Sequence, residues 1–367
     1  MDPKIDDLYL NNDVLKFTLS NINVTIANTI RRTILSDIDT YVFKTYPYNE
    51  CDAEIEINTT RFNNEILKQR LSCIPIHSTD PDLPIDNLLL VVDMENNTNE
   101  IQYVTTEHFK IYDTTTKTFM PSSDISKMFP PNNITKQYID FVRLRPKISS
   151  EIPGEYIKLT CKISKSNAKE DSMFNVACNS SYGFTRDKDK IDKVWNETEK
   201  QLIKDETSTE DIEYAKKDFY NLDCKKYYIA NSFDFTIQTV GIYTCYELVQ
   251  KACQIIYNSF DEFKKDIDSL QINVSDTTIN NCFDICLFYK DHTFGKCMEY
   301  LLYSKFYEGE ERLSYCGFMK KHPHDNYCIV RIAYKEEVDR ETIIKDIITV
   351  CDAAIVLFKN MEQLFIE

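Results

Sequence analysis

Four residues in the last quarter of the chain have side chains that can bind metals or act as nucleophiles: Cys282, Cys286, His292 and Cys297. The two nearest cysteines are four positions apart in a segment that reads as a strand, which places them on one face but not side by side. Zinc sites usually take their ligands as closely spaced pairs in turns, and cysteine is also a common small core residue. We therefore expect these thiols to pack in the core, and we expect no metal, cofactor or catalytic residue. A metal-dependent or thiol enzyme that uses the four residues is the alternative.

No other pattern in the sequence indicates catalysis. The six glycines are too widely spaced for a dinucleotide-binding fingerprint or a phosphate-binding loop. His322 and His324 flank a proline, so we expect them to shape a turn. The 59 acidic residues are so abundant that two carboxylates close in sequence say little about acid–base chemistry.

Two adjacent arginines, Arg31 and Arg32, lie in the middle of the segment Asn23–Thr40. Isoleucines recur there at every fourth position: Ile26, Ile30, Ile34 and Ile38. This spacing predicts an amphipathic helix, in which Arg31 borders the buried face and Arg32 points away from it. Arginines on a helix usually form a solvated face, but arginine beside an apolar surface also suits paired recognition at an interface. The residues alone leave both interpretations open.

The same helical pattern returns at Asp291–Lys305 near the other end of the chain. Four residues match at one constant offset: Thr293 with Thr25, Phe294 with Ile26, Gly295 with Ala27, and Met298 with Ile30. Each half is predicted to run strand, helix, strand, strand, long helix, and each half is too small to bury its apolar helices alone. We expect the halves to pack together as a pseudo-two-fold dimer within one chain. The predicted interface residues are Ile30, Ile34, Ile255, Phe294, Met298, Ile348 and Ile355.

The predicted fold class is α+β, with a mixed α/β domain inserted into the first half. Predicted boundaries are 1–47 and 224–270 for the first half, 48–223 for the insertion, 271–281 for a linker, and 282–367 for the second half. The charged stretch 186–220 is predicted to be a mostly solvated helix with no chemistry.

Composition limits the functions that the chain can have. A formal net charge of −16 excludes a broad nucleic-acid surface or anionic-membrane surface. The 13 cysteines are scattered, odd in number and not preceded by a leader-like segment, so we expect free thiols in a reducing intracellular compartment.

A set of motifs in order gives the most specific signal. NVTIANTIRRTILSDIDT (Asn23–Thr40) resembles the signature helix of bacterial RNA polymerase α and its archaeal and eukaryotic α-like relatives. Further similar blocks are NTTRFNNEILKQRLSCIPIH (58–77), YVTTEHF (103–109), FVRLRP (141–146), ISKSNAKEDSMFNVA (163–177) and SFDFTIQTVG (232–241). DHTFGKCMEYLL, followed by CGFMKKHPHDNYCIVRI (316–332), is similar to the smaller α-like subunit of eukaryotic and archaeal polymerases.

The resemblance implies that the larger and smaller α-like subunits are fused here, as in large DNA viruses with their own transcription machinery. It implies a non-catalytic assembly scaffold that binds the largest and second-largest catalytic subunits and small polymerase subunits. Neither a homodimer, nor a membrane partner, nor tight direct DNA binding is expected. The site of action would be a virus factory in the host cytoplasm, the nucleus, or the virion.

By motif match, the resemblance assigns partner contacts to Asn28, Arg31 and Arg32 in the signature helix, and to Arg70, Leu71 and Pro75 in the insertion. The second copy has Glu299 where the first has Arg31, so only one copy is expected to make the arginine contact. Some larger α-like subunits hold zinc or an iron–sulfur cluster through cysteines of the inserted domain. This chain has no cysteine between Ile74 and Thr160, so neither group is expected.

Overall fold

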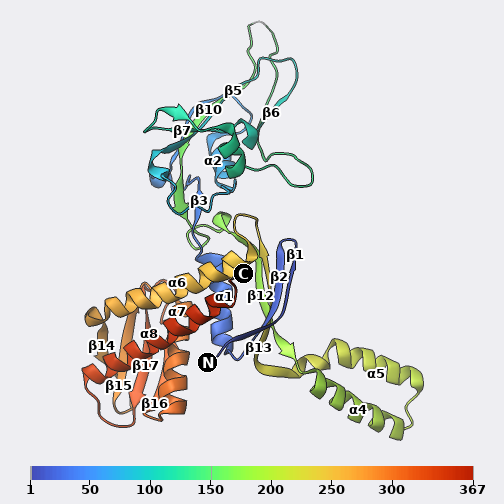
Figure 1. The fold of residues 1–367 in the computed structure, drawn as a ribbon, viewed down its shortest axis with the longest axis vertical. Helices are drawn as coiled ribbons and strands as arrows, with labels where there is room; N and C mark the ends of the chain where they lie inside the picture. Colours follow the sequence, from blue (N-terminus) through green and yellow to red (C-terminus); the bar gives the residue numbers. More distant parts are fainter. Residues whose placement is uncertain (1, 150, 367) are drawn as a thin grey trace. The chain divides into compact units, whose positions relative to one another are not determined.

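The computed structural model describes residues 2–149 and 151–366, which form two compact units (Figure 1). Unit 1 comprises Met1–Ile34, Asn179–Gln238 and Cys245–Glu367. Unit 2 comprises Leu35–Cys178 and Thr239–Thr244. The architecture mixes helices with several antiparallel sheets, which confirms the predicted α+β class.

The first sheet of unit 1 has the strand order β1-β2-β13-β12. Its strands are β1 (Lys4–Asn11), β2 (Val14–Ser20), β12 (Ala177–Arg186) and β13 (Tyr228–Thr239). Alternate side chains of β2 are buried, which places one face of the sheet in the core. The signature helix α1 (Val24–Ser36) follows β2 directly, and Asn23 caps it by accepting a hydrogen bond from the backbone N–H of Thr25 at 2.9 Å.

The second sheet of unit 1 has the order β14-β15-β17-β16. Its strands are β14 (Gln271–Val274), β15 (Cys282–Phe288), β16 (Leu313–Met319) and β17 (Tyr327–Tyr334). The associated helices are α6 (Cys245–Lys265), α7 (His292–Leu302), which continues as a π-helix over Tyr303–Gly309, and α8 (Arg340–Gln363). The structure corrects one prediction here, because Gln271–Val274 is an edge strand paired with β15 and not part of a linker. The strand is too short and too polar for an alternation of apolar and polar residues to be recognised in the sequence.

The charged stretch predicted to be one solvated helix is a helical hairpin in unit 1. It consists of α4 (Lys188–Lys204) and α5 (Thr209–Asn221). The hairpin has a small core of its own, made by Ile191, Trp195, Phe219 and Cys224. Because β12 and β13 flank the hairpin and belong to the β1–β2 sheet, residues 179–223 belong to unit 1, although the predicted insertion 48–223 included them.

Unit 2 is built on a five-stranded sheet of order β4-β10-β5-β7-β8. Its strands are β4 (Ala53–Asn58), β5 (Leu88–Glu95), β7 (Lys110–Asp113), β8 (Thr118–Phe119) and β10 (Tyr156–Lys162). Two small ladders pair β3 (Thr40–Val42) with β11 (Ser164–Ser166), and β6 (Gln102–Thr105) with β9 (Asp140–Leu144). Helices α2 (Asn64–Ser72) and α3 (Ser122–Met128) complete the unit. Strand β3 is short and ends at Val42.

Short 3₁₀ turns occupy Tyr48–Glu50, Ile85–Asn87, Thr106–His108, Ser172–Phe174, Asp223–Lys226 and Ile267–Ser269. Among the described residues, no helix is both long enough and apolar enough to cross a membrane.

Candidate functional site

The two longest helices of unit 1, α6 and α8, pack against each other in antiparallel fashion. Figure 1 shows them side by side, α6 in yellow-orange and α8 in red. Side-chain donors on α6 reach acceptors in and just beyond α8: Gln250 Nε2 to the Phe365 carbonyl at 2.7 Å, Gln254 Nε2 to Glu362 Oε1 at 2.6 Å, and Lys264 Nζ to Asp352 Oδ1 at 2.6 Å. As residue numbers rise along α6, those of their partners fall, so the two helices run alongside each other through most of their length.

Buried apolar side chains line this helix pair. On α6 they are Leu248, Val249, Ala252, Cys253, Ile256 and Phe260, and on α8 they are Ile343, Ile347, Val350, Cys351, Ala354, Leu357, Phe358 and Met361. The predicted residues Ile255, Ile348 and Ile355 are only half-buried, each one position before or after a fully buried neighbour. The buried face of each helix is therefore turned slightly away from these three predicted interface isoleucines.

Helix α7 of the second half joins this helix pair through Phe294. The Phe294 ring stacks on Phe260 of α6 with centroids 4.4 Å apart, and it meets the edge of Phe263 at 5.3 Å. Lys290 Nζ lies 4.8 Å from the Phe294 ring centroid and donates a hydrogen bond to Ser259 Oγ at 2.8 Å. Aromatic stacking with a cation above the ring adds attraction to plain burial. Phe294 therefore links the predicted second half to the long helix of the first.

Helix α1 contributes both buried isoleucines and the two arginines. Ile30 and Ile34 are buried, as the interface prediction requires of them. Arg32 is exposed but donates from Nε to Thr293 Oγ1 on α7 at 2.9 Å, so it ties α1 to its counterpart helix. No residue pattern indicated this contact, since Thr293 was singled out only as a member of the repeat.

Arg31 has a different environment. It is half-buried, and its Nε donates to Oδ1 of Asn28, one turn earlier on α1, at 2.9 Å. The pair fixes the guanidinium against the helix surface while its remaining N–H groups stay available for carboxylates. Asn28 and Arg31, which the resemblance assigned together, thus form one local unit.

The equivalent positions on α7 carry side chains of different charge. Glu299 stands where α1 has Arg31, and Lys296 stands where α1 has Asn28. Lys296 Nζ contacts Glu299 Oε2 at 2.6 Å. The two related helices therefore present different chemistry at matched surface positions.

The other predicted contact residues belong to unit 2 and have structural roles there. Arg70 Nε donates to the Phe141 carbonyl at 2.6 Å, and its Nη2 donates to the Asp140 carbonyl at 2.7 Å, so the side chain ties α2 to β9. Leu71 is only 1% exposed and lies in the unit 2 core, which contradicts a partner contact by its side chain. Leu71 is an apolar residue on the buried face of α2, so the helical spacing of apolar residues could have indicated that its side chain is buried. Pro75 is half-buried.

The structure does not bring the four candidate catalytic residues together. Cys286 accepts a hydrogen bond from Asn273 Nδ2 at 3.6 Å, Cys297 is buried beside Thr29, and the His292 ring meets Phe318 at 5.1 Å. Burial raises the pKa of both Cys286 and Cys297, which keeps these thiols neutral and poorly nucleophilic. Within residues 2–149 and 151–366, no three His, Cys, Asp or Glu side chains form a group that could hold a metal ion. The enzyme alternative therefore has no site to support it.

Two ionic contacts stiffen the second half. Arg331 on β17 makes a two-pronged contact with Asp284 on β15, with N–O distances of 2.7 and 2.8 Å. Hydrogen bonding to Arg331 lowers the pKa of Asp284. The buried Asp346 of α8 accepts hydrogen bonds from Arg312 at 2.7 Å and from the Tyr334 hydroxyl at 2.8 Å. Burial raises the pKa of Tyr334, with Asp346 adding to the effect, so this hydroxyl remains a donor.

The fold is that of a dimerisation domain, with two sheet-and-helix halves joined through α6, α7 and α8 and with two arginines on α1. Residues 16–260 match the family described as the RNA polymerase Rpb3/Rpb11 dimerisation domain. The chain belongs to this family of RNA polymerase α-like domains.

Three curated relatives illustrate the similarity. The chain is 23% identical over 316 residues to the human subunit RPAC1 of DNA-directed RNA polymerases I and III, covering 74% of this chain and 86% of that protein. It is 24% identical over 270 residues to the RNA polymerase subunit Rpo3 of Pyrococcus furiosus, covering 70% and 94%. A shorter stretch of 76 residues is 34% identical to subunit 3 of RNA polymerases II, IV and V of Arabidopsis thaliana, covering 21% and 22%.

Proposed function

We propose that the chain is a non-catalytic assembly subunit of a multisubunit DNA-directed RNA polymerase, in which both members of an α-like pair are fused. The observation that carries this proposal is the antiparallel contact of α6 with α8. It joins a half that lies within the family match to a half, 282–367, that lies beyond it. Family membership supports the assembly role. The repeat and the helix contact support the fusion.

The proposed partner surface is the exposed side of α1. Asn28 and Arg31 would meet the second-largest catalytic subunit, with Arg32 beside them. The largest subunit and small polymerase subunits would bind elsewhere on the platform. A homodimer through α6 and α8 is not proposed, because these helices already bury their apolar stripes against each other.

A co-expression experiment tests the partner surface. The chain would be produced with the second-largest polymerase subunit of the same organism, and the complex would be captured on a tag attached to the chain. Arg31→Ala is expected to weaken capture roughly tenfold, because truncating an arginine at the centre of an interface costs about 1–2 kcal/mol. Arg186→Ala, an exposed arginine on β12, is the matched control and should leave capture unchanged. Equal capture by both variants would contradict the proposed role of Arg31.

We also propose that the source is a large DNA virus and that the chain acts in a reducing compartment, namely the host cytoplasm, the nucleus or the virion. The fused arrangement supports the first part. The 13 free cysteines support the second, since exposed thiols such as Cys73 and Cys178 would readily oxidise elsewhere. Immunogold labelling of infected cells tests both parts. Label over virus factories, nuclei or virions is expected, and label confined to secretory compartments would refute the proposal.

A further inference from the structure

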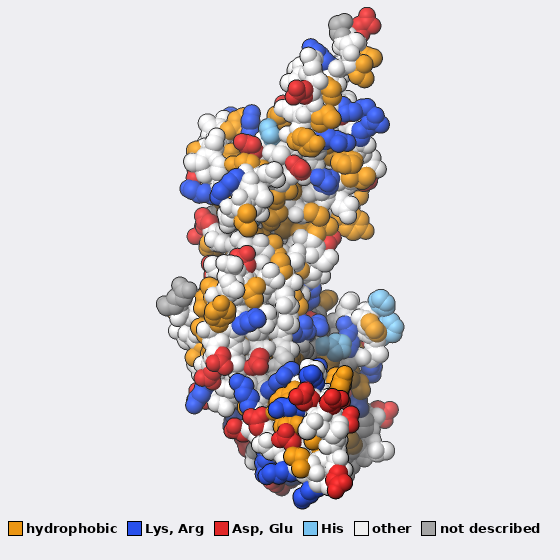
Figure 2. Space-filling view, turned by 90° about the vertical axis from the view of Figure 1, so that its right-hand side faces the viewer, with side chains coloured by type: hydrophobic (Ala, Val, Ile, Leu, Met, Phe, Trp, Pro, Cys, Tyr) orange, Lys and Arg blue, Asp and Glu red, His pale blue; other side chains and the backbone are white. Residues whose placement is uncertain are grey.

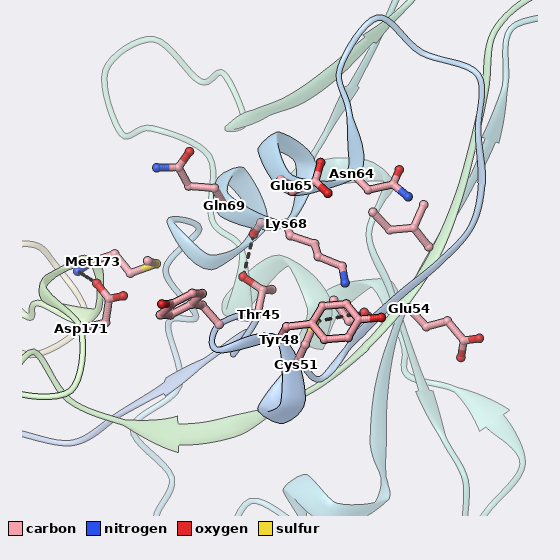
Figure 3. Close-up of a pocket in the computed structure, with 13 residues that line it drawn as sticks. Thr45, Tyr48, Cys51, Glu54, Asn64, Glu65, Lys68, Gln69, Asp171 and Met173 are labelled. Carbon is pink, nitrogen blue, oxygen red and sulfur yellow. Dashed lines mark hydrogen bonds between the residues drawn. The ribbon is translucent and has the colours of Figure 1, made fainter.

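Unit 2 contains an open groove that the proposed assembly role does not use. Its volume is about 840 Å³, and it runs between helix α2, strand β4 and the 3₁₀ turn at Tyr48–Glu50 (Figure 3). The residues that matter most for its chemistry are Tyr46, Tyr48, Glu54, Ile55, Glu65 and Lys68.

One side of the groove is a free strand edge. Strand β4 is the first strand in the order β4-β10-β5-β7-β8, and among the described residues β10 is its only strand partner. Such an edge presents unpaired backbone N–H and C=O groups, which are a template for another extended chain. Residues of β4 line the groove from Ala53 to Ile55, so the groove opens directly onto this edge.

Two tyrosines beside the groove are unusually exposed. Tyr46 is 74% exposed and Tyr48 is 88% exposed. Lys68 Nζ lies 5.7 Å from the Tyr48 ring centroid, and Figure 3 shows the two side chains pointing toward each other. Tyrosine provides a large, fairly rigid contact area with a polar tip, which is why it is enriched in protein interfaces. The half-buried Ile55 adds an apolar contact on the strand itself.

Free carboxylates give the groove negative charge. Glu54 and Glu65 are both exposed, and neither forms an ion pair among the described residues. By contrast, the next acidic residue of β4, Glu56, is neutralised by Lys158 at 2.5 Å. Lys68 is the cationic residue of the groove lining, and its ammonium group lies over the Tyr48 ring. A ligand that brings positive charge to Glu54 would be favoured.

We propose that this groove binds an extended peptide segment of another polypeptide, which adds to β4 as a strand and alternates apolar with basic side chains. Side chains of a strand alternate between its two faces, and Ile55 and Glu54 lie on opposite faces of β4. An added strand would therefore set apolar side chains beside Ile55 and Tyr48, and basic side chains beside Glu54. This docking mode goes beyond the proposed assembly role and does not depend on it.

Fluorescence anisotropy with the full chain tests the proposal. The probe is a fluorescein-labelled hexapeptide of alternating valine and lysine, and a peptide of alternating valine and glutamate is the reference. The lysine peptide is expected to bind, and the glutamate peptide is not. Glu54→Lys should weaken binding of the lysine peptide at least tenfold. Glu100→Lys, an equally acidic and exposed position of unit 2 outside the groove lining, should leave binding unchanged. Circular dichroism would establish that both variants fold.

A second pair of measurements separates strand addition from simple charge attraction. N-methylation of alternate amides of the lysine peptide should abolish binding, because it removes the donors that an added strand needs. Hydrogen exchange at the amides of β4 should slow when the unmodified peptide binds. No binding, binding that survives N-methylation, or equal effects of the two lysine variants would each overturn the proposal. Because this assay contains no other polymerase subunit, its failure would leave the assembly role untouched, and failed assembly would leave the groove untouched.

Discussion

Helices α1 and α7 hold matched positions in the two halves of the chain, yet they differ in what they bury and in what they expose. At buried positions both are apolar: Phe294 matches Ile26, and Met298 matches Ile30. Outside the buried face, the pair of Asn28 with Arg31 is replaced by Lys296 with Glu299. One helical framework thus supports both halves, while the charge on the outer side of α1 differs from the charge on the outer side of α7.

The packing of the two helices differs as well. A Cβ atom added at Gly295 would lie 2.1 Å from Cε2 of Phe318, whereas the matched Ala27 carries its Cβ in the core. Helix α7 therefore approaches the hairpin of its own sheet more closely than a larger residue would allow. The aromatic ring of Phe294 on the same helix packs against α6.

The largest expected effect comes from removing the aromatic link between the halves. Phe294→Ala is expected to lower the free energy of unfolding by about 3–5 kcal/mol, because it deletes a buried ring stacked on Phe260. Guanidinium unfolding followed by circular dichroism measures the change. Phe288→Ala, which removes a half-exposed ring from β15, should cost much less. Similar losses in the two variants would mean that Phe294 is not a link between the halves.

A reciprocal exchange sharpens the difference between α1 and α7. Gly295→Ala is expected to cost about 1–3 kcal/mol, since Phe318 must move to admit the new methyl group. Ala27→Gly should cost about 1 kcal/mol, which is the usual penalty for glycine within a helix. Thermal unfolding of both variants gives the comparison. If Gly295→Ala is the milder change, the close approach of α7 to Phe318 is disproved.

The smallest effect is a dependence on pH that belongs to the second half. Hydrogen bonding to Arg331 lowers the folded-state pKa of Asp284, so the pair contributes stability above the unfolded pKa of about 4. That contribution, about 1 kcal/mol for a partly buried pair, should disappear as the pH falls through the lowered folded-state pKa. Asp284→Asn is expected to lower stability at pH 7 and to change it little at pH 2. Urea unfolding at the two pH values measures this, and an equal loss at both would show that charge is not the cause.

Residue spacing predicted the parts of the fold that repeat with a strong period. The spacing of Ile26, Ile30 and Ile34 predicted α1, although Ile38 lies two residues beyond its end, and the matching run from Asp291 predicted α7. The α6–α8 contact was predicted in its position along the chain, but Ile255, Ile348 and Ile355 are only half-buried, while neighbouring residues such as Ala354 are fully buried. Spacing could not reveal that β12 and β13 draw residues 179–238 into unit 1, since strand pairing is a long-range choice.

The candidate site was predicted less completely than the fold. Arg31 and Asn28 lie together as the signature helix implied, but the contact of Arg32 with Thr293 depends on how two distant helices meet. Leu71 was assigned from a motif, and its burial shows that a motif residue can serve the core. The groove beside β4 arises from three separate segments, so no local pattern announces it.

The central claim is that two α-like halves within one chain bind each other, and dividing the chain tests it most directly. Fragments 1–279 and 280–367, cut within the loop between β14 and β15, would be co-expressed with a tag on one fragment only. We expect recovery of a one-to-one complex, and we expect loss of that complex when Ala252→Arg places a charge in the α6–α8 contact. Fragments that purify separately, or a complex that Ala252→Arg leaves intact, would contradict it.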